Sequence, residues 1–420
     1  MIVLQRKEDC CGCHACESVC PTRCITMRED AEGFLYPETD VSKCIDCHLC
    51  EKVCPVIQSP LRTGINVPLA KDFLETPRVF AARCGSDALR MASASGGAFT
   101  VLAERVIQNG GVVFGARWNE DFTEAVHDFT ETLDGLSAFR GSKYLQSRIG
   151  DAFKKCREFL LAGREVMFTG TPCQIAGLRR ALRRDFPKLL AVDIACHSTP
   201  SPKVWKAFWT DLWERESIET PVDVLFRKKV FDTKNKRWNC AMFSVETPAG
   251  TAFCKPLYAT SYGKGFGQGL FSRPSCHECP SKNRTSGSDI TIGDFWGVEK
   301  YYPQLKSNEG LSVVICNTER GNTAFDAVKS GFGILQEARY EQAVPANGGL
   351  KNETHRHPRR EAFFQAFNSA ENVQTAVSVI GEFTKIPFPR RVRNFAARCL
   401  RFALRRTGTL NLAKRILKRK

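Results

Sequence analysis

The sequence predicts a multidomain α+β protein with a small cysteine-rich module, a larger α/β domain and a helical basic tail. Ten of its 20 cysteines fall within residues 10–54. Predicted strands and helices alternate over residues 78–215, as they do in α/β domains. Residues 385–420 hold 13 Lys and Arg and no Asp or Glu. The chain therefore consists of at least three segments that differ in composition.

Length and composition set the class of protein. The chain has 420 residues, enough for two or three domains at roughly 150 residues each. Hydrophobic residues make up 43% and charged residues 25%, which excludes wholesale disorder and fibrous structure. No apolar run approaches the ~18 residues of a membrane span, and the N-terminus has no apolar signal-peptide stretch. We therefore expect a cytoplasmic protein.

Residues 1–58 are predicted to form the first domain, because they contain two copies of one cysteine motif. The copies begin at Cys10 and Cys44, and both read C-x-x-C-x-x-C-x-x-x-C-P. Three cysteines at this spacing wrap one face of a 4Fe–4S cluster, and the fourth cysteine is exchanged with the other copy. The motifs therefore predict two clusters. Their ligand sets are Cys10, Cys13, Cys16 and Cys54 for one cluster and Cys20, Cys44, Cys47 and Cys50 for the other.

A pair of zinc sites is the alternative for these cysteines. Structural zinc usually takes two separated ligand pairs, and not three cysteines followed by a fourth and a proline, so we favour iron and sulfur. A reducing cell interior also favours metal binding over disulfides. The module resembles bacterial two-cluster ferredoxins over about residues 5–58, which would make it a carrier of single electrons.

A linker is expected over residues 59–77, which contain three prolines and a glycine, and an α/β domain follows. Apolar periodicity predicts helices over 97–109, 151–161, 173–184 and 201–215 and strands over 111–118, 165–168 and 189–195. Such alternation predicts a largely parallel sheet. Ligands of these sheets bind beyond the carboxyl ends of the strands, and Cys173 and Cys196 each follow a strand there.

Residues 218–350 are predicted to be richer in strands and loops, and they contain a third cysteine motif. Cys276 and Cys279 form a lone C-x-x-C pair. Such a pair suits a zinc half-site, a redox dithiol or half of an iron–sulfur site. Together with Cys173 and Cys196 the pair would supply four thiolates. The spacing alone leaves these possibilities open.

Six short motifs, in a fixed order after the ferredoxin-like module, resemble one protein family. They are Ser93–Phe99, Gly141–Ser147, Gly170–Gln174, Cys196–His197, Arg273–Cys276 with Cys279, and Gly293–Gly297. Over roughly residues 5–345 the chain is similar to the beta subunit of the coenzyme F420 (deazaflavin) hydrogenase/dehydrogenase family. It looks most like the bacterial stand-alone members that carry a fused ferredoxin domain.

The resemblance implies an FAD-binding oxidoreductase, with 78–160 and 161–345 as the two parts of its flavin-binding domain. It also implies a third 4Fe–4S cluster, for which Cys173, Cys196, Cys276 and Cys279 are the candidate ligands. A Ser/Gly turn before a helix suits a pyrophosphate, although alone it is usually only an N-cap. The candidate FAD-binding residues are Ser93, Ser95, Gly96, Gly97, Ser142, Lys143, Tyr144, Gln146, Thr169, Gly170, Thr171 and Pro172.

Four side chains have candidate roles beside the flavin. Lys143 is expected to pair with a phosphate and Tyr144 to stack on a ring; the alternative is a solvated lysine beside a half-buried tyrosine. His197 is the candidate catalytic residue, as a donor of a proton or a hydrogen bond, and a structural histidine is the alternative. Asp294 ends an apolar strand and belongs either to the site or to a turn cap.

The end of the chain is predicted to consist of a connecting segment, 346–384, and a basic amphipathic tail, 385–420. Without the tail the chain holds 48 Lys and Arg against 45 Asp and Glu, so the basic character belongs to the tail. Such a helix suits an anionic surface such as the inner membrane, and docking on the body or a partner is the alternative. Nucleic acid is not expected, because the body is nearly neutral and lacks a nucleic-acid-binding motif.

Two functions from different classes fit this organisation. The first is an enzyme that passes electrons between the clusters and FAD, with hydride exchange to a soluble deazaflavin (coenzyme F420) or another organic acceptor. By analogy with stand-alone relatives, polysaccharide biosynthesis is one setting for such an acceptor. The second is a non-catalytic electron-transfer subunit that relays electrons to a partner enzyme. The sequence makes no prediction of the acceptor, the direction of electron flow or the oligomeric state.

Overall fold

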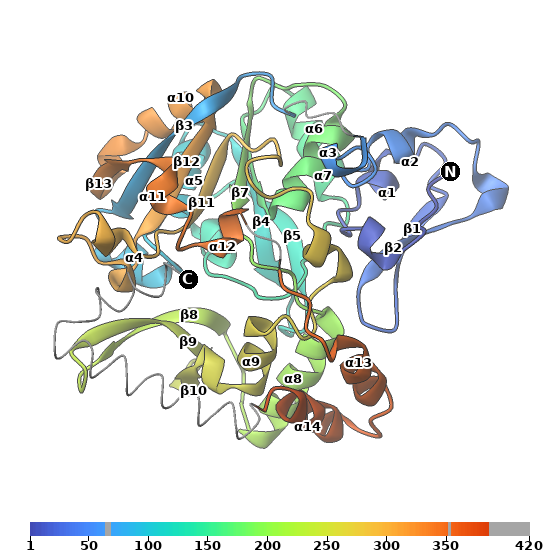
Figure 1. Ribbon diagram of the computed structural model, residues 1–420. Helices are drawn as coiled ribbons and strands as arrows, with labels where there is room; N and C mark the ends of the chain where they lie inside the picture. Colours follow the sequence, from blue (N-terminus) through green and yellow to red (C-terminus); the bar gives the residue numbers. More distant parts are fainter. Residues whose placement is uncertain (64–68, 352–353, 386–420) are drawn as a thin grey trace, which may run out of the picture.

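The computed structural model describes residues 1–63, 69–351 and 354–385. A small ferredoxin-like domain lies at one edge of a larger body, which has an upper and a lower layer (Figure 1). The predicted amphipathic tail lies outside the described residues, apart from Lys385. In the part of the chain that is described, no helix is both long and apolar enough to cross a membrane.

The ferredoxin-like domain consists of two similar halves. Its elements are η1 (Lys7–Asp9), α1 (Ala15–Val19), β1 (Ile25–Glu29), β2 (Leu35–Thr39), η2 (Val41–Lys43) and α2 (Leu49–Lys52), followed by α3 (Pro60–Thr63). Each half places a cysteine loop before a short helix. His14 and His48, both with left-handed backbones, precede α1 and α2. The antiparallel pair β1–β2 joins the halves, and α1 contacts the body.

The upper layer of the body is built on an eight-stranded sheet. Its strands are β3 (Phe73–Cys84), β4 (Val112–Trp118), β5 (Ala125–Thr130), β6 (Val166–Gly170), β7 (Leu189–Ile194), β11 (Ile290–Asp294), β12 (Ser312–Thr318) and β13 (Phe332–Ala338). They lie in the order β13-β3-β12-β11-β7-β6-β4-β5. The middle strands β11, β7, β6 and β4 are parallel, whereas the flanking pairs are antiparallel.

The prediction of a largely parallel sheet is therefore wrong for the flanks. The periodic pattern covers only the segment in which helices alternate with strands, and this segment forms the parallel centre. Strand β3 begins at Phe73, inside the segment 59–77 that was expected to be a linker, and pairs with β12 and β13 from far along the chain. Long-range pairing of this kind has no local signature. The predicted helices and strands between residues 97 and 215 are confirmed to within a few residues.

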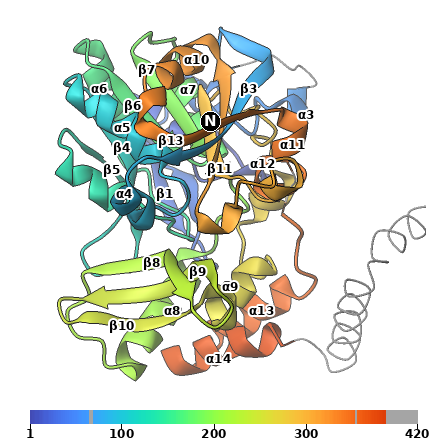
Figure 2. The same cartoon turned by 90° about the vertical axis from the view of Figure 1, so that its left-hand side faces the viewer.

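Helices cover both faces of this sheet (Figures 1 and 2). They are α5 (Ala98–Gln108), α6 (Ala152–Leu161), α7 (Pro172–Leu182) and α10 (Glu319–Asp326), with the shorter α4 (Asp87–Ala92), α11 (Tyr340–Ala343) and α12 (Gly348–Lys351). Phe114 and Phe168 pack under α6 and α7, whereas Val113 and Met167 pack under α5 on the other face. Successive residues of a strand point to opposite faces, so strands covered on both sides are continuously apolar.

The lower layer has an aromatic core. Its elements are β8 (Asp223–Asp232), β9 (Arg237–Thr247), β10 (Gly250–Pro256), α8 (Pro202–Arg215), α9 (Ser261–Gly267), α13 (Arg360–Asn368) and α14 (Val373–Phe383). Trp205 stacks on Trp118, with 5.3 Å between ring centroids, and joins this core to the end of β4. Its indole N–H donates to the carbonyl of Phe122. Helices α13 and α14, from the expected connecting segment 346–384, pack against α8 and α9 and complete the core.

Candidate functional site

Two groups of cysteines form in the ferredoxin-like domain. The inner group consists of Cys10, Cys13, Cys16 and Cys54, and the outer group consists of Cys20, Cys44, Cys47 and Cys50. Burial, together with the nearby thiols of Cys10 and Cys54, raises the pKa of Cys16. Cys13 packs on helix α7, where a Cβ added at Gly177 would lie 2.9 Å from its Sγ. The inner group therefore faces the body.

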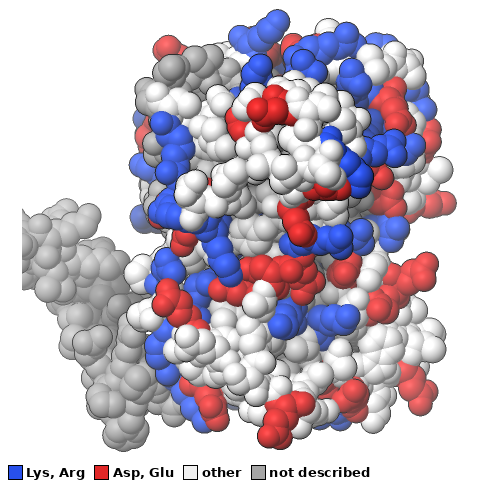
Figure 3. All heavy atoms as spheres, turned by 90° about the vertical axis from the view of Figure 1, so that its right-hand side faces the viewer, with Lys and Arg blue, Asp and Glu red and all other residues white. Residues whose placement is uncertain are grey.

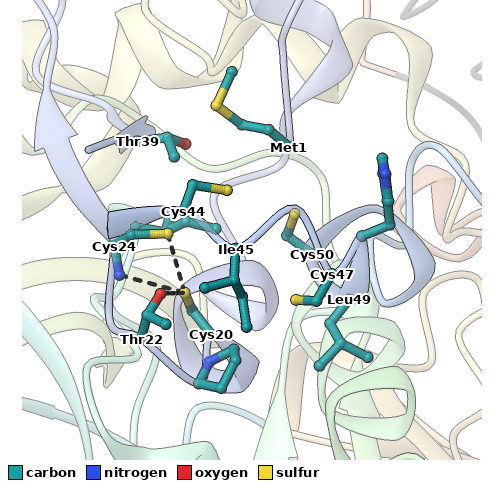
Figure 4. A pocket seen from close by; sticks show the side chains of 13 residues that line it. Met1, Cys20, Thr22, Cys24, Thr39, Cys44, Ile45, Cys47, Leu49 and Cys50 are labelled. Carbon is teal, nitrogen blue, oxygen red and sulfur yellow. Dashed lines mark hydrogen bonds between the residues drawn. The ribbon is translucent and has the colours of Figure 1, made fainter. Parts of the chain in front are cut away.

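The outer group lines a small pocket (Figure 4). Cys24 also lines it, and its backbone N–H donates to Cys20 Sγ over 3.3 Å. Burial would raise the pKa of Cys20, but hydrogen bonds from Cys24 and Thr22 outweigh burial and lower it. Cys47 is exposed, whereas the four cysteines of the inner group are buried or half-buried. The two groups thus differ in their access to solvent.

The body brings four further cysteines together. This body group consists of Cys173, Cys196, Cys276 and Cys279. Cys173 lies in the first turn of α7, and Cys196 follows β7, so the parallel pair β6–β7 brings them to the same edge of the sheet. Burial and the thiols of Cys173 and Cys276 raise the pKa of Cys279 to about 12. Four thiols in so apolar a place ionise readily only if a cation offsets their charge.

Sulfur atoms of the body group and of the inner group have hydrogen-bond donors nearby. The backbone N–H of Thr199 donates to Cys276 Sγ over 3.4 Å, and the hydroxyl of Thr171 lies 3.3 Å from Cys173 Sγ. In the inner group the N–H of Gly12 donates to Cys10 Sγ over 3.4 Å. Such bonds to sulfur help to set the potentials of iron–sulfur clusters. The donor set therefore fits clusters.

The arrangement of the thiols helps to distinguish a single metal ion from a 4Fe–4S cluster. Within the described ranges, no three Cys, His, Asp or Glu side chains are gathered closely enough to hold a single metal ion. A 4Fe–4S cubane stands between its four thiolates and bonds each of them through a different iron atom. It therefore needs four thiols around a central space, and not three ligands gathered on a single ion.

A cavity of about 550 Å³ opens beyond the carboxyl ends of β6, β7 and β11. This is the edge at which parallel sheets bind ligands, and the volume suits a cofactor. Cys196 of the body group forms part of its wall. The predicted residues that line it are Ser93, Ser95, Gly97, Ser142, Lys143, Tyr144, Thr169, Gly170, Thr171, His197 and Asp294. Gly96, Gln146 and Pro172 were also predicted, but they do not line the cavity.

The Ser/Gly turn enters the cavity at the N-terminus of α5. Ser95 Oγ donates to the carbonyl of Leu311, and the N–H of Gly96 donates to Ser312 Oγ over 2.9 Å. A Cβ at Gly96 would lie 2.3 Å from the carbonyl oxygen of Ala82, so this glycine lets the turn approach β3 closely. The turn is thus held rigidly, with the first residues of α5 facing the cavity.

Lys143 and Tyr144 have partners within the protein. The ammonium of Lys143 donates to the carbonyls of Ala138 and Arg140 over 2.8 and 2.9 Å. Burial lowers the pKa of Lys143 to about 8. The ring of Tyr144 stacks on Phe266, with 4.7 Å between centroids. Lys143 thus shapes the loop at the cavity with its own hydrogen bonds, and Tyr144 presents a fixed ring.

Arg227 is a cavity residue that the sequence analysis did not identify. Its guanidinium forms two hydrogen bonds with the carboxylate of Asp294, over 2.9 and 3.3 Å, and a third with the hydroxyl of Tyr144. It also lies 5.4 Å from the ring centroid of Trp296. Burial opposes its charge, but Tyr144 and Asp294 hold the pKa of Arg227 above its usual value. No local motif marks Arg227, because its partners come from other strands and loops.

His127 is the second residue that was missed, and it anchors the end of β6. Its Nε2–H donates to the carbonyl of Thr169 over 3.0 Å, so Nδ1 accepts from the hydroxyl of Ser147 over 3.1 Å. Gln174 Nε2 donates to the same hydroxyl and links the network to α7. Burial lowers the pKa of His127 to about 4, so the ring is neutral near pH 7. The alternation of β5 could have marked it as inward-facing.

His197 lies on the cavity wall directly after Cys196. Burial, followed by the charge of Lys282, lowers the pKa of its imidazole. Its carbonyl accepts a hydrogen bond from the ammonium of Lys282 over 3.1 Å. A neutral imidazole at this place can both donate and accept a hydrogen bond.

Comparisons with known proteins found a family, a curated relative and a solved structure that are similar to this chain. Residues 163–339 match the family described as the C-terminal part of the coenzyme F420 hydrogenase/dehydrogenase beta subunit, and residues 9–57 match a 4Fe-4S dicluster domain. One subunit of the F(420)H(2) dehydrogenase of Methanosarcina mazei is 23% identical over 341 residues, which are 79% of this chain and 85% of that protein. A chain of the F420-reducing NiFe hydrogenase complex from Methanosarcina barkeri has a TM-score of 0.44 at 17% identity and covers 73% of this chain and 97% of its own.

Proposed function

Because this chain belongs to the family of coenzyme F420 hydrogenase/dehydrogenase beta subunits, with a 4Fe-4S dicluster domain at residues 9–57, we propose that it is an FAD-dependent iron–sulfur oxidoreductase. The inner, outer and body groups of cysteines would each hold one 4Fe–4S cluster. When bound, a flavin exchanges electron pairs with an organic partner and single electrons with iron–sulfur clusters.

The wall of the cavity suits the parts of FAD. The N-terminus of α5, with Ser95 and Gly97, offers backbone N–H groups to a diphosphate, and the helix dipole favours its negative charge. Tyr144 and Trp296 offer aromatic faces to a ring system. Arg227, buried between them, adds a fixed positive charge that would favour added electron density on such a ring.

His197 is proposed to serve the organic partner at the same wall. Its lowered pKa keeps the imidazole neutral near pH 7, so it can hold a proton at one ring nitrogen and accept one at the other. A deazaflavin of the coenzyme F420 type is the proposed partner, because the relative from Methanosarcina mazei is named as part of an F(420)H(2) dehydrogenase.

Continuity between the cavity and the three cysteine groups carries the proposal. Cys196 of the body group lines the cavity. The thiol of Cys11 interacts both with Cys173 of the body group and with Cys13 of the inner group. The inner group in turn lies beside the outer group. Burial and the thiols of Cys10 and Cys54 have the larger effects on the pKa of Cys16, and the thiol of Cys50, in the outer group, also raises it. Electrons would therefore have an unbroken line from the cavity to the edge of the molecule.

The outer group is the proposed contact point for a partner redox protein. Cys47 is exposed, and the neighbouring side chains of Val41 and Ile45 are 67% and 65% exposed. The surrounding face carries Lys and Arg interspersed with Asp and Glu, with uncharged surface between them (Figure 3). An electron carrier with a small apolar contact patch suits this face better than a strongly charged partner.

A non-catalytic electron-transfer subunit is the second candidate function. The name of the Methanosarcina mazei relative, which is one subunit of a dehydrogenase, favours it. The cavity of about 550 Å³ favours an enzyme, since a pure relay has no use for so large a site. Reduction or oxidation of soluble deazaflavin by the isolated chain separates the two functions, because only an enzyme turns it over.

The first test is an anaerobic purification with counts of iron and flavin per chain. We expect about one FAD and about twelve irons, at four irons for each of three cubanes. Cys279→Ser should lose about four of these irons, whereas Cys254→Ser, at an exposed cysteine outside all three groups, should lose none. About eight irons without flavin in the unmodified chain would contradict the proposal and leave a ferredoxin fused to a binding domain.

A further inference from the structure

Arg273 is fully buried, and no carboxylate among the described residues pairs with it. Its guanidinium donates to the carbonyl of Cys10 over 2.8 Å, to Gln146 Oε1 over 2.8 Å and to the carbonyl of Leu35 over 2.9 Å. It also lies over the ring of Tyr36, 4.4 Å from the centroid. Carbonyl dipoles and a ring face stabilise a cation, but none of them carries a negative charge.

Other buried arginines of this protein are neutralised directly. Arg179 and Arg360, which are 6% and 3% exposed, pair with the carboxylates of Asp289 and Glu32 over 2.7 and 2.6 Å. A buried charge without a counter-charge is costly, so the lack of a carboxylate beside Arg273 within the described residues calls for another source of negative charge.

Two of the cysteine groups lie beside Arg273. Arg273 begins the short 3-10 helix η5 (Pro274–Glu278), and the N–H of Cys276, in the body group, donates to its carbonyl. At its other end the guanidinium holds the loop of Cys10, in the inner group. The thiols of Cys10, Cys11 and Cys276 all act on the guanidinium electrostatically. Arg273 therefore lies between the inner group and the body group.

We propose that the positive charge of Arg273 sets the reduction potentials of the clusters held by the inner and body groups. A 4Fe–4S cluster with four thiolates is negatively charged, and reduction adds one more negative charge. A permanent cation nearby stabilises the reduced cluster more than the oxidised cluster and so raises the potential. The inference rests on the proposed iron–sulfur function.

A purely structural role is the competing explanation, and the loop offers a matched control for it. Gln146 holds the same loop, because its Nε2 donates to the carbonyl of Cys11 over 3.0 Å. A Cβ at Gly12 would lie 2.6 Å from Gln146 Nε2 and 2.7 Å from Arg273 Nη1, so both side chains pack closely against the loop. Gln146→Met removes this hydrogen bond to the loop without changing the charge.

The experiment is a potentiometric titration of the fully loaded protein with dithionite, followed by electron paramagnetic resonance. Neutral variants Arg273→Met and Arg273→Gln should make the inner and body clusters at least tenfold harder to reduce, a shift of about 59 mV for one electron. The outer cluster, whose signal Cys47→Ser identifies, should keep its potential. Arg273→Lys, which keeps the charge, and Gln146→Met should leave all three potentials nearly unchanged.

Three results would overturn the proposal. Unchanged potentials in both neutral variants would remove the electrostatic role. An equal shift in Gln146→Met would assign the effect to the shape of the loop. Loss of iron from both neutral variants but not from Gln146→Met would make Arg273 a structural support for the clusters. If the unmodified protein holds no clusters at all, it is the proposed function that fails.

Discussion

Breaking the ion pair between Arg227 and Asp294 should loosen the cavity wall and lower the amount of FAD that the protein retains. Asp294→Asn removes the counter-charge of Arg227, whose side chain is 9% exposed, and leaves its guanidinium with neutral partners such as the Tyr144 hydroxyl and the Cys240 carbonyl. Removing one partner of a buried ion pair costs about 3–5 kcal/mol. Because the Asp294 side chain is 16% exposed, we take the low end, about 3 kcal/mol. For a domain of 150–250 residues this corresponds to a fall in Tm of about 6–12 °C.

The assay is a double-mutant cycle of Arg227→Met and Asp294→Asn, with Tm and FAD per chain measured for each protein. Each single variant should lose stability, and the double variant should lose less than the sum, because no unpaired charge is left. Arg117→Met is the control, since Arg117 and Asp128 form an ion pair in which both side chains are 38% exposed, worth about 1 kcal/mol or less. Additive losses, or single losses as small as that of the control, would refute the reasoning.

Three further predictions concern separate parts of the chain. The low folded-state pKa of His127, about 4 against 6.5 when unfolded, means that unfolding takes up a proton at mildly acid pH. The neutral, buried ring therefore contributes about 3 kcal/mol to the free energy of unfolding above pH 6.5, and this contribution is lost as the pH falls to 4. In His127→Gln, Tm should therefore fall less steeply over this pH range. Gly96→Ala should abolish FAD binding in a flavin count, because its Cβ collides with the backbone of β3, whereas Gly381→Ala, with open space around it, should not. Deletion of residues 385–420 should abolish co-sedimentation with anionic liposomes; equal sedimentation of both chains would exclude membrane attachment through the tail.

The cysteine motifs and the alternating elements were predictable because their information is local. The C-x-x-C-x-x-C spacing places three cysteines in one short loop, so the motif can be read without knowledge of the fold. The apolar run Val166–Phe168 likewise indicates a strand that is covered on both faces, and β6 is such a strand. Such patterns need no knowledge of the rest of the chain.

The rest depends on contacts between distant segments. Arg227 and Asp294 are 67 positions apart, and only the meeting of β8 with the end of β11 pairs them. Lys143 illustrates the same limit: a lysine in a Gly-Ser-Lys-Tyr stretch was expected to pair with a phosphate, and only the fold shows that the carbonyls of its own loop also accept hydrogen bonds from its ammonium. The local sequence indicated a cation at this loop, but not the groups within the protein that bind it.

Burial gives a reason why the proposed charge of Arg273 would matter at the inner group and not at the outer one. A cluster in an apolar place is harder to reduce, because the added charge is poorly solvated. The outer group borders solvent through the exposed Cys47, so water can offset that charge. The inner group packs on α7 through Cys13, and none of its four cysteines is exposed. A buried cation in contact with the loop of Cys10 replaces the missing solvation there, and it would keep the potentials of the two ferredoxin clusters close enough for electrons to pass in either direction.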